Sequence, residues 1–263
     1  MRSLAKQCYF LACRLLIPLL PERRVSILLY HDIGESDLYL TVPTERFRAQ
    51  MKFLKDEGYR VISLSELFGY LKRGAPLPAR TVVLTFDDAY HSHAGVVREV
   101  LEACGFPGTV FVPTGSLGGT LGNSEEKPQP ILDEAALRDL ATSGCVTLAP
   151  HSVSHREFTS LATTEVVQEI HDSKATLDEL VDTSTCFAYP RGAYTREHAQ
   201  LVAESGFAGA VTVRPGLVGP QSDPYELPRN TITSGTSWKE FRVLVSPAAG
   251  VAAAGLRALQ REV

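Results

Sequence analysis

Two adjacent carboxylates and two closely spaced histidines are the residues of this chain whose types and spacing could do chemistry. Asp87 and Asp88 follow the apolar run TVVLTF, and His151 and His155 follow the run CVTLA. A turn or helix cap accounts for one such Asp but not for two. The histidine spacing directs both rings at one centre if the segment forms a helical turn. Two histidines and one carboxylate bind a divalent transition metal with positions left open for water.

Three further segments place polar side chains where predicted strands end. His31 and Asp32 follow the first apolar run, and a Tyr-Pro-Arg-Gly turn at 189–192 can point a backbone N–H into the mouth of a barrel. Arg229 lies in a loop from which it can reach a carboxylate. For the turn and for Arg229, an ordinary βα turn and a solvated surface side chain are the commoner outcomes.

The elements that must position these residues alternate between apolar or β-branched runs and amphipathic stretches, which is typical of repeated βα units. We therefore expect an α/β fold, an irregular (β/α) barrel of about seven parallel strands, with chemistry at the carboxyl ends of the strands. A Gly-rich loop at 115–130 is expected beside one strand end. The predicted strands span 25–30, 59–63, 81–86, 109–113, 145–149, 185–189 and 208–213. The predicted helices run from a cap at Thr44 to Gly58, and over 96–104, 133–142, 164–180 and 195–205.

Composition bounds the class of protein. The chain has 263 residues, of which 44% are hydrophobic and 21% charged, as in globular domains. A net charge of −4 and the lack of a basic run with aromatics exclude an electrostatic footprint for nucleic acid. The five cysteines contain no Cys-x-x-Cys pair, so neither a disulfide framework nor a thiolate zinc site is predicted. We expect a barrel domain at 25–245 and a helical tail at 246–263.

The N-terminal segment, 1–24, carries an ambiguous targeting signal. Basic residues precede an apolar stretch at 8–20, which Arg14 divides into halves too short to span a bilayer. The pattern is equally compatible with an amphipathic helix on a membrane surface and with a helix packed on the domain. The protein is accordingly expected at a membrane or in the cytoplasm, and export stays open.

The motifs together resemble a known family. TFDD at 85–88, HSVSH at 151–155 and YPRG at 189–192 are similar in type and order to the motifs of the polysaccharide deacetylases, carbohydrate esterase family four. The resemblance extends over about residues 25–240. LLYHDIG and ELPRN are similar to the branch that contains deacetylases of poly-β-1,6-N-acetylglucosamine. The resemblance implies a metal-dependent hydrolase that removes N-acetyl groups from N-acetylhexosamine units of a polysaccharide or a lipid-linked saccharide.

The resemblance also implies a role for each matching residue. Asp87 would be the general base, and Asp88, His151 and His155 would bind a divalent metal. Zinc is expected, although cobalt, nickel and iron accept the same donors. The metal and the backbone N–H of Arg191 would stabilise the oxyanion that forms when water attacks the acetamide carbonyl.

The proton donor to the leaving amine is less directly implied. Many relatives use a His near the C-terminus, but this chain has none after His198. We expect His31 to take the role, as the corresponding N-terminal His is thought to do in the exopolysaccharide branch. His91 and His93, which follow the Asp pair, stay open as alternatives.

Three departures from the family pattern carry consequences. Ala89 stands where Gly is usual, which matters only if the position needs a positive φ. Ala188 stands where an Arg is usual, so we hypothesise that Arg229 pairs with Asp87 instead and keeps it ionised. Arg191 replaces a Tyr, which changes the side chain at the pocket while keeping the backbone donor.

Alternative functions share parts of this site. A deacylase of a lipid-linked aminosugar, for example a deformylase, would use the same chemistry, and a catalytically inactive glycan-binding relative would keep only the fold. A ferrous oxygenase would share the metal ligands, but it needs a cosubstrate site and usually a jelly roll, for which no pattern is present. Tyr90, Tyr194 and Trp238 could stack on sugars, although such aromatics are at least as often core residues.

Overall fold

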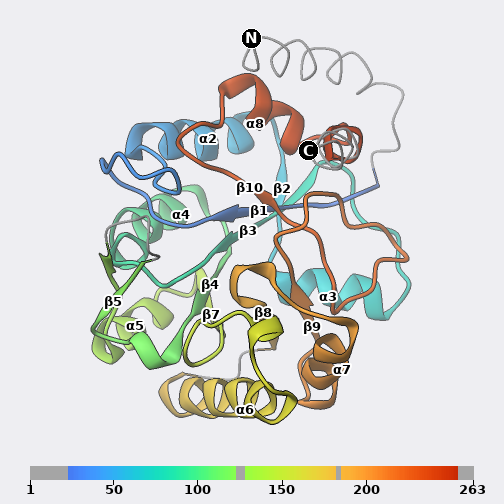
Figure 1. Cartoon of the computed structure of the whole chain (residues 1–263). Coiled ribbons are helices and arrows are strands. Elements are labelled where there is room, and N and C mark those ends of the chain that lie inside the picture. Colours follow the sequence, from blue (N-terminus) through green and yellow to red (C-terminus); the bar gives the residue numbers. More distant parts are fainter. Residues whose placement is uncertain (1–22, 123–127, 182–184, 254–263) are drawn as a thin grey trace, which may run out of the picture.

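The computed structural model describes residues 23–122, 128–181 and 185–253 (Figure 1). The N-terminal segment expected at a membrane surface, 1–24, therefore lies outside the described residues except for its last two positions. The expected tail at 246–263 is described only to residue 253, and residues 249–253 of it are helical. In the described part of the chain, no helix is both long and apolar enough to cross a membrane.

All seven predicted strands are present, together with an eighth that the sequence analysis did not predict, β10. Parallel strands form a sheet in the order β10-β1-β3-β4-β7, with β2 paired to the start of β3, and β8 pairs in parallel with β9. The strands are β1 (Ser26–Tyr30), β2 (Arg60–Val61), β3 (Thr81–Phe86), β4 (Gly108–Val112), β7 (Val146–Pro150), β8 (Cys186–Ala188), β9 (Gly209–Val211) and β10 (Asn230–Thr231).

The barrel is irregular and incompletely closed, as predicted. Single bridges, Val211 to Leu227 and Val25 to Val218, connect the strands on the side where the described residues form no continuous ladder. β1, β3 and β4 are buried along their whole length, as expected for parallel strands covered on both faces. Ile27 contributes to an inner apolar cluster and the next residue, Leu28, to an outer one.

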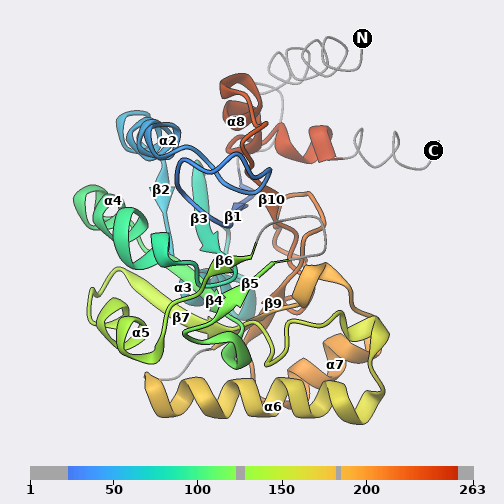
Figure 2. The same ribbon diagram turned by 60° about the vertical axis from the view of Figure 1, so that its left-hand side comes forward.

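Helices surround the strands on the outside of the molecule (Figure 1), and the longest, α6, runs beside β7 and α7 (Figure 2). Among the described residues, seven α-helices precede the tail at 246–253, and five of them were predicted. The two that were missed are α3 and α8. Each begins after a Ser whose side chain caps the helix, and a Glu stands three residues after that Ser, which is a recognisable helix-start signal. The helices are α2 (Thr44–Asp56), α3 (Leu64–Lys72), α4 (Arg98–Cys104), α5 (Glu134–Ala141), α6 (Thr163–Leu180), α7 (Arg196–Glu204) and α8 (Trp238–Leu244).

Two local expectations need correction. Thr44 is not the cap of α2, because Pro43 occupies the N-cap position and Thr44 is already helical. The Gly-rich segment after β4 is not only loop, because it contains a short antiparallel pair, β5 (Thr120–Leu121) and β6 (Gln129–Pro130). The predicted left-handed Gly58 is confirmed, with a φ of 68°.

The close packing of β9 against α3 yields a stability prediction. A Cβ added at Gly209 would collide with the ring of Phe68 and the carbonyl oxygen of Pro224. Gly209→Ala should therefore lower the free energy of unfolding by about 1–3 kcal/mol, measured by urea denaturation. The matched control is Gly219→Ala, where the added Cβ meets open space and the expected change is below about 0.5 kcal/mol. Equal midpoints for the two variants would contradict this packing.

Candidate active site

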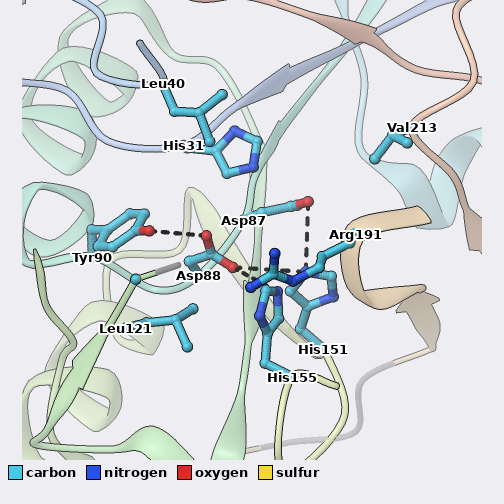
Figure 3. A pocket seen from close by; sticks show the side chains of 11 residues that line it. His31, Leu40, Asp87, Asp88, Tyr90, Leu121, His151, His155, Arg191 and Val213 are labelled. Atoms are coloured by element: carbon cyan, nitrogen blue, oxygen red, sulfur yellow. Dashed lines mark hydrogen bonds and ion pairs between the residues drawn. The ribbon is translucent and has the colours of Figure 1, made fainter. Parts of the chain in front are cut away.

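The carboxyl ends of several strands meet around a pocket of about 170 Å³ (Figure 3). β3 leads into Asp87 and Asp88, β7 into the loop at 151–155 that carries both histidines (the His loop), and β1 into His31. The barrel thus brings together residues that are far apart in sequence. Six of the seven predicted site residues line the pocket: His31, Asp87, Asp88, His151, His155 and Arg191. The seventh, Arg229, is fully buried behind Asp87.

Three of these side chains could hold one metal ion. One oxygen or nitrogen each from Asp88, His151 and His155 lies within 4.8 Å of the others. The Oδ1 atom of Asp88 lies 3.3 Å from Nε2 of His155 and 3.7 Å from Nε2 of His151. Donors about 2.1 Å from a tetrahedral zinc lie about 3.4 Å apart, so the separations suit a single ion.

The hydrogen bonds of the three residues also suit a cation. Oδ1 of Asp88 is buried and has no hydrogen-bond partner among the described residues, although a buried carboxylate oxygen normally needs one. Tyr90 donates its hydroxyl to the other oxygen, Oδ2, at 3.0 Å, which directs Oδ1 toward the histidines. His151 Nδ1 lies 2.8 Å from the carbonyl oxygen of Ala188 and donates to it, which leaves Nε2 free to bind. Burial lowers the pKa of His155 to about 4, against the opposing charge of Asp88, so its ring is neutral at pH 7.

The His loop is not a helical turn, which corrects the sequence expectation. No residue between 151 and 157 is helical, and both Ser152 and His155 have a positive φ, 63° and 56°. The hydroxyl of Ser152 accepts a hydrogen bond from the N–H of His155 at 3.1 Å. The two rings therefore converge, with centroids 4.8 Å apart, because of two left-handed residues rather than helical spacing.

Positive φ angles recur at the other strand ends. Asp88 has a φ of 75° and Ala89 a φ of 50°. The departure at Ala89 thus matters, because a residue other than Gly is strained there by about 1–3 kcal/mol. Arg191 has a φ of 54° and Gly192 one of 68°. The turn holds Gly192 so close to Val213, which lines the pocket, that no side chain fits between them.

Arg229 forms a two-point ion pair with Asp87, which confirms the predicted pairing. Its Nη1 and Nη2 atoms lie 2.6 and 2.7 Å from the two carboxylate oxygens. The same guanidinium donates to the carbonyl oxygen of Thr212 and to the hydroxyl of Thr85, and it lies over the ring of Phe111. Burial alone would raise the pKa of Asp87, but the charge and hydrogen bonds of Arg229 hold it well below its usual range.

His31 borders the pocket on the side opposite to the His loop (Figure 3). Its backbone is held by His93, whose Nε2 lies 2.8 Å from the carbonyl oxygen of His31. His93 is fully buried and does not line the pocket, and His91 is exposed. Asp32 accepts hydrogen bonds from Ser92 and Thr41 and so fixes the loop that follows. Of the three histidines considered as proton donor, only His31 reaches the pocket.

Some pocket residues were not found from the sequence. Tyr90 was considered only as a platform for sugars, whereas its hydroxyl orients Asp88. Leu40 and Leu121 supply apolar walls from two loops, and no local signal in the sequence marks them. Tyr194 stacks on Tyr189, and the exposed Trp238 packs against Phe53 of α2 and Phe241 of α8. Neither side chain lines the pocket.

Comparison with known proteins agrees with the fold and the motifs. PplD, a deacetylase of Streptococcus pyogenes solved in complex with acetate, has a TM-score of 0.75 and 25% identity, covering 86% of this chain and 100% of that one. YxkH of Bacillus subtilis, named as a polysaccharide deacetylase, is 28% identical over 219 residues, which are 83% of this chain and 75% of that protein. The poly-β-1,6-N-acetyl-D-glucosamine N-deacetylase of Escherichia coli K12 is 31% identical over 128 residues, 46% of this chain but only 19% of that protein.

The family follows from a direct match. The sequence pattern of the polysaccharide deacetylase family matches residues 74–210, about half of the chain. The chain therefore belongs to the polysaccharide deacetylase family. His31 and Arg229 lie outside the matched range, so their placement at the site comes from the structure.

The buried ion pair leads to a prediction about stability. Arg229→Met leaves the carboxylate of Asp87 buried without a cation and should lower the free energy of unfolding by about 3–5 kcal/mol. Adding Asp87→Asn removes the stranded charge, so the double variant should be more stable than Arg229→Met alone. Urea unfolding of the two single variants and the double variant gives the coupling energy. Arg214→Met, which breaks an exposed pair with Glu226, is the control and should cost less than about 1 kcal/mol. Strict additivity of the Arg229 and Asp87 changes would show that the pair is not coupled.

Proposed function

We propose that the protein is a metal-dependent carbohydrate N-deacetylase that removes acetyl groups from N-acetylhexosamine units of an exopolysaccharide. One observation carries the proposal: the ionised Asp87, held by Arg229, lies beside the Asp88, His151 and His155 group in a small pocket. A proton acceptor next to a cation site is one arrangement that hydrolyses an unactivated amide, because the cation polarises the carbonyl while the acceptor takes a proton from water.

The cation site and the base would act on the same water. Asp88, His151 and His155 would hold a divalent cation, whose Lewis acidity would polarise the acyl carbonyl and acidify water. Arg229 occupies one site on each oxygen of Asp87 and leaves the others open to accept a proton. The low pKa of Asp87 keeps it ionised but makes it a weak base, so it depends on an acidified water.

The remaining steps fall to His31 and the turn at Arg191. As the water oxygen bonds to the carbonyl carbon, its proton passes to Asp87, and the N–H of Arg191 is proposed to donate to the developing oxyanion. His31 as imidazolium then gives a proton to the amine nitrogen while the C–N bond breaks, releasing acetate and the free amine. Arg191 is exposed at the pocket and its charge would face the glycan.

The size of the pocket limits the acyl group. A volume of about 170 Å³ is close to that of a cavity of about 150 Å³ that holds one benzene molecule, so it suits a small acyl group such as acetyl or formyl. Two relatives carry names that specify a polysaccharide deacetylase, and the Escherichia coli enzyme acts by name on poly-β-1,6-N-acetyl-D-glucosamine. These names support an acetylated polysaccharide as substrate, and no feature of the site specifically favours a formylated lipid-linked sugar.

The direct test is acetate release from oligomers of β-1,6-linked N-acetylglucosamine. The metal-loaded protein should release acetate, and Asp87→Asn and His151→Ala should each lower the rate by at least about 100-fold, since one lacks the base and the other a ligand. Treatment with a chelator should abolish release, and added zinc or cobalt should restore it. A metal-loaded protein that releases formate from a formylated aminosugar but no acetate would replace the proposal with the deformylase alternative.

The role of His31 can be tested separately by changing the leaving group. An amine must be protonated to leave, whereas an aryl oxide need not be. His31→Ala should therefore lower the rate on the amide by about 100-fold to 10,000-fold, but affect an aryl acetate ester far less. His91→Ala is the matched control, because His91 is exposed and does not line the pocket. Equal losses of His31→Ala on amide and ester would rule out proton donation, and a selective loss in His91→Ala would transfer the role.

A further inference from the structure

The His loop, residues 151–155, carries two proposed metal ligands, and its backbone is strained. Ser152 and His155 both adopt left-handed backbone conformations, which are unfavourable for residues other than Gly. Such conformations persist only where surrounding contacts hold them. The contacts that hold this loop therefore decide where the ring of His155 lies relative to that of His151.

One edge of the His loop is held by the segment after β4. The N–H of Thr114 donates to the carbonyl oxygen of Ser152 at 3.1 Å, and the N–H of Gly115 donates to that of Val153 at 2.9 Å. A Cβ at Gly115 would lie 2.7 Å from that same oxygen, so the two backbones approach as closely as a Gly permits. This edge therefore satisfies two carbonyl groups of the loop, those of Ser152 and Val153.

The N–H groups at the other edge converge on a single side chain, Glu169 of α6. Its Oε2 atom accepts from the N–H of Val153 and the N–H of Ser154, both at 2.8 Å. Its Oε1 atom accepts from the hydroxyl of Ser154 at 2.6 Å. Hydrogen bonds to an ionised carboxylate are about twice as strong as neutral ones, and two successive N–H groups form a concave anion site.

We propose that Glu169 is a positioning residue for the metal site: it clamps the His loop from α6 and thereby sets the geometry in which His151 and His155 present their nitrogens. The proposal rests on the proposed function for the identity of the ligands. Within the described ranges, Glu169 does not line the pocket, and its hydrogen bonds go only to Val153 and Ser154, which lie between the two histidines. Its effect on a bound cation is therefore transmitted through the backbone.

The physical consequence concerns metal affinity rather than chemistry. Without the carboxylate, two N–H groups lose their acceptor, and the loop can relax from its left-handed angles. The nitrogens of the two histidines would then have to be brought together on binding, which lowers affinity. Groups that orient metal ligands in this way contribute about 10-fold to 100-fold to metal affinity.

The test measures metal binding by the whole chain without any glycan. The zinc dissociation constant, from competition with a chelating dye, should rise about 10-fold to 100-fold in Glu169→Ala. Glu169→Gln keeps the length and one acceptor oxygen, so its affinity should fall between those of Glu169→Ala and the unmodified protein. The visible absorption of the cobalt-loaded protein should change in Glu169→Ala, because it reports the geometry of the ligands.

Controls separate this effect from a loss of folding. Gln168→Ala changes the exposed neighbour on α6 and should leave affinity and spectrum unchanged. Ser154→Ala removes only the hydroxyl donor, so a smaller loss of affinity is expected even if Glu169→Ala does not fold. Unchanged affinity and spectrum in Glu169→Gln and Ser154→Ala, or no metal binding by the unmodified chain, overturns the proposal. A chain that binds metal with this dependence on Glu169 but releases no acetate overturns only the proposed function.

Discussion

The ion pair between Asp87 and Arg229 ties together the inside of the barrel. The two residues are 142 positions apart, and both are almost completely removed from water. A buried charge is tolerated only when it is paired, so neither residue can occupy its place without the other. Arg229 also donates to Thr85 at the end of β3 and to Thr212 after β9, and it packs on Phe111 of β4. The packing inside the barrel and the ionisation of Asp87 therefore both depend on this pair.

Around this pair, the backbone is strained where the proposed chemistry needs it. Five of the six residues other than Gly with positive φ in the described part of the chain lie at the site: Asp88, Ala89, Ser152, His155 and Arg191. Left-handed turns let the chain leave a strand abruptly and present a side chain or N–H toward the barrel mouth. Replacing Asp88 or His155 by Gly would relieve the strain but would remove a proposed metal ligand. The contacts of the rigid parallel strands and of Glu169 offset that strain.

The sequence predicts the strands well because buried parallel strands are nearly continuous apolar runs, as in β1 and β3. Polar residues after such runs are conspicuous, which is why the structure brings all seven predicted site residues to one place: six line the pocket, and Arg229 lies behind Asp87. The pairing of Arg229 was predicted because Ala188 stands where the family usually has an Arg, so another cation was needed beside Asp87. Contacts set by tertiary packing carried no such signal. Tyr90 and Glu169 act through hydrogen bonds whose partners only the folded chain brings near, and the loop at 152–155 takes its shape from packing rather than from spacing.

The two neighbouring carboxylates differ in their expected roles because they differ in their partners. Asp87 and Asp88 are adjacent and buried, so two negative charges there would repel each other strongly unless each met a positive charge. Arg229 neutralises Asp87 within the protein. Among the described residues, Asp88 meets only the hydroxyl of Tyr90 and the edges of two histidine rings, and its Oδ1 atom has no hydrogen-bond partner. The proposed divalent cation would balance the charge at Asp88, because it would bind both that oxygen and the two ring nitrogens. A carboxylate whose charge Arg229 already neutralises is a poor metal ligand, and a carboxylate bound to a metal ion is a poor base. The proposed roles of Asp87 and Asp88 therefore follow from their partners and not from their order in the sequence.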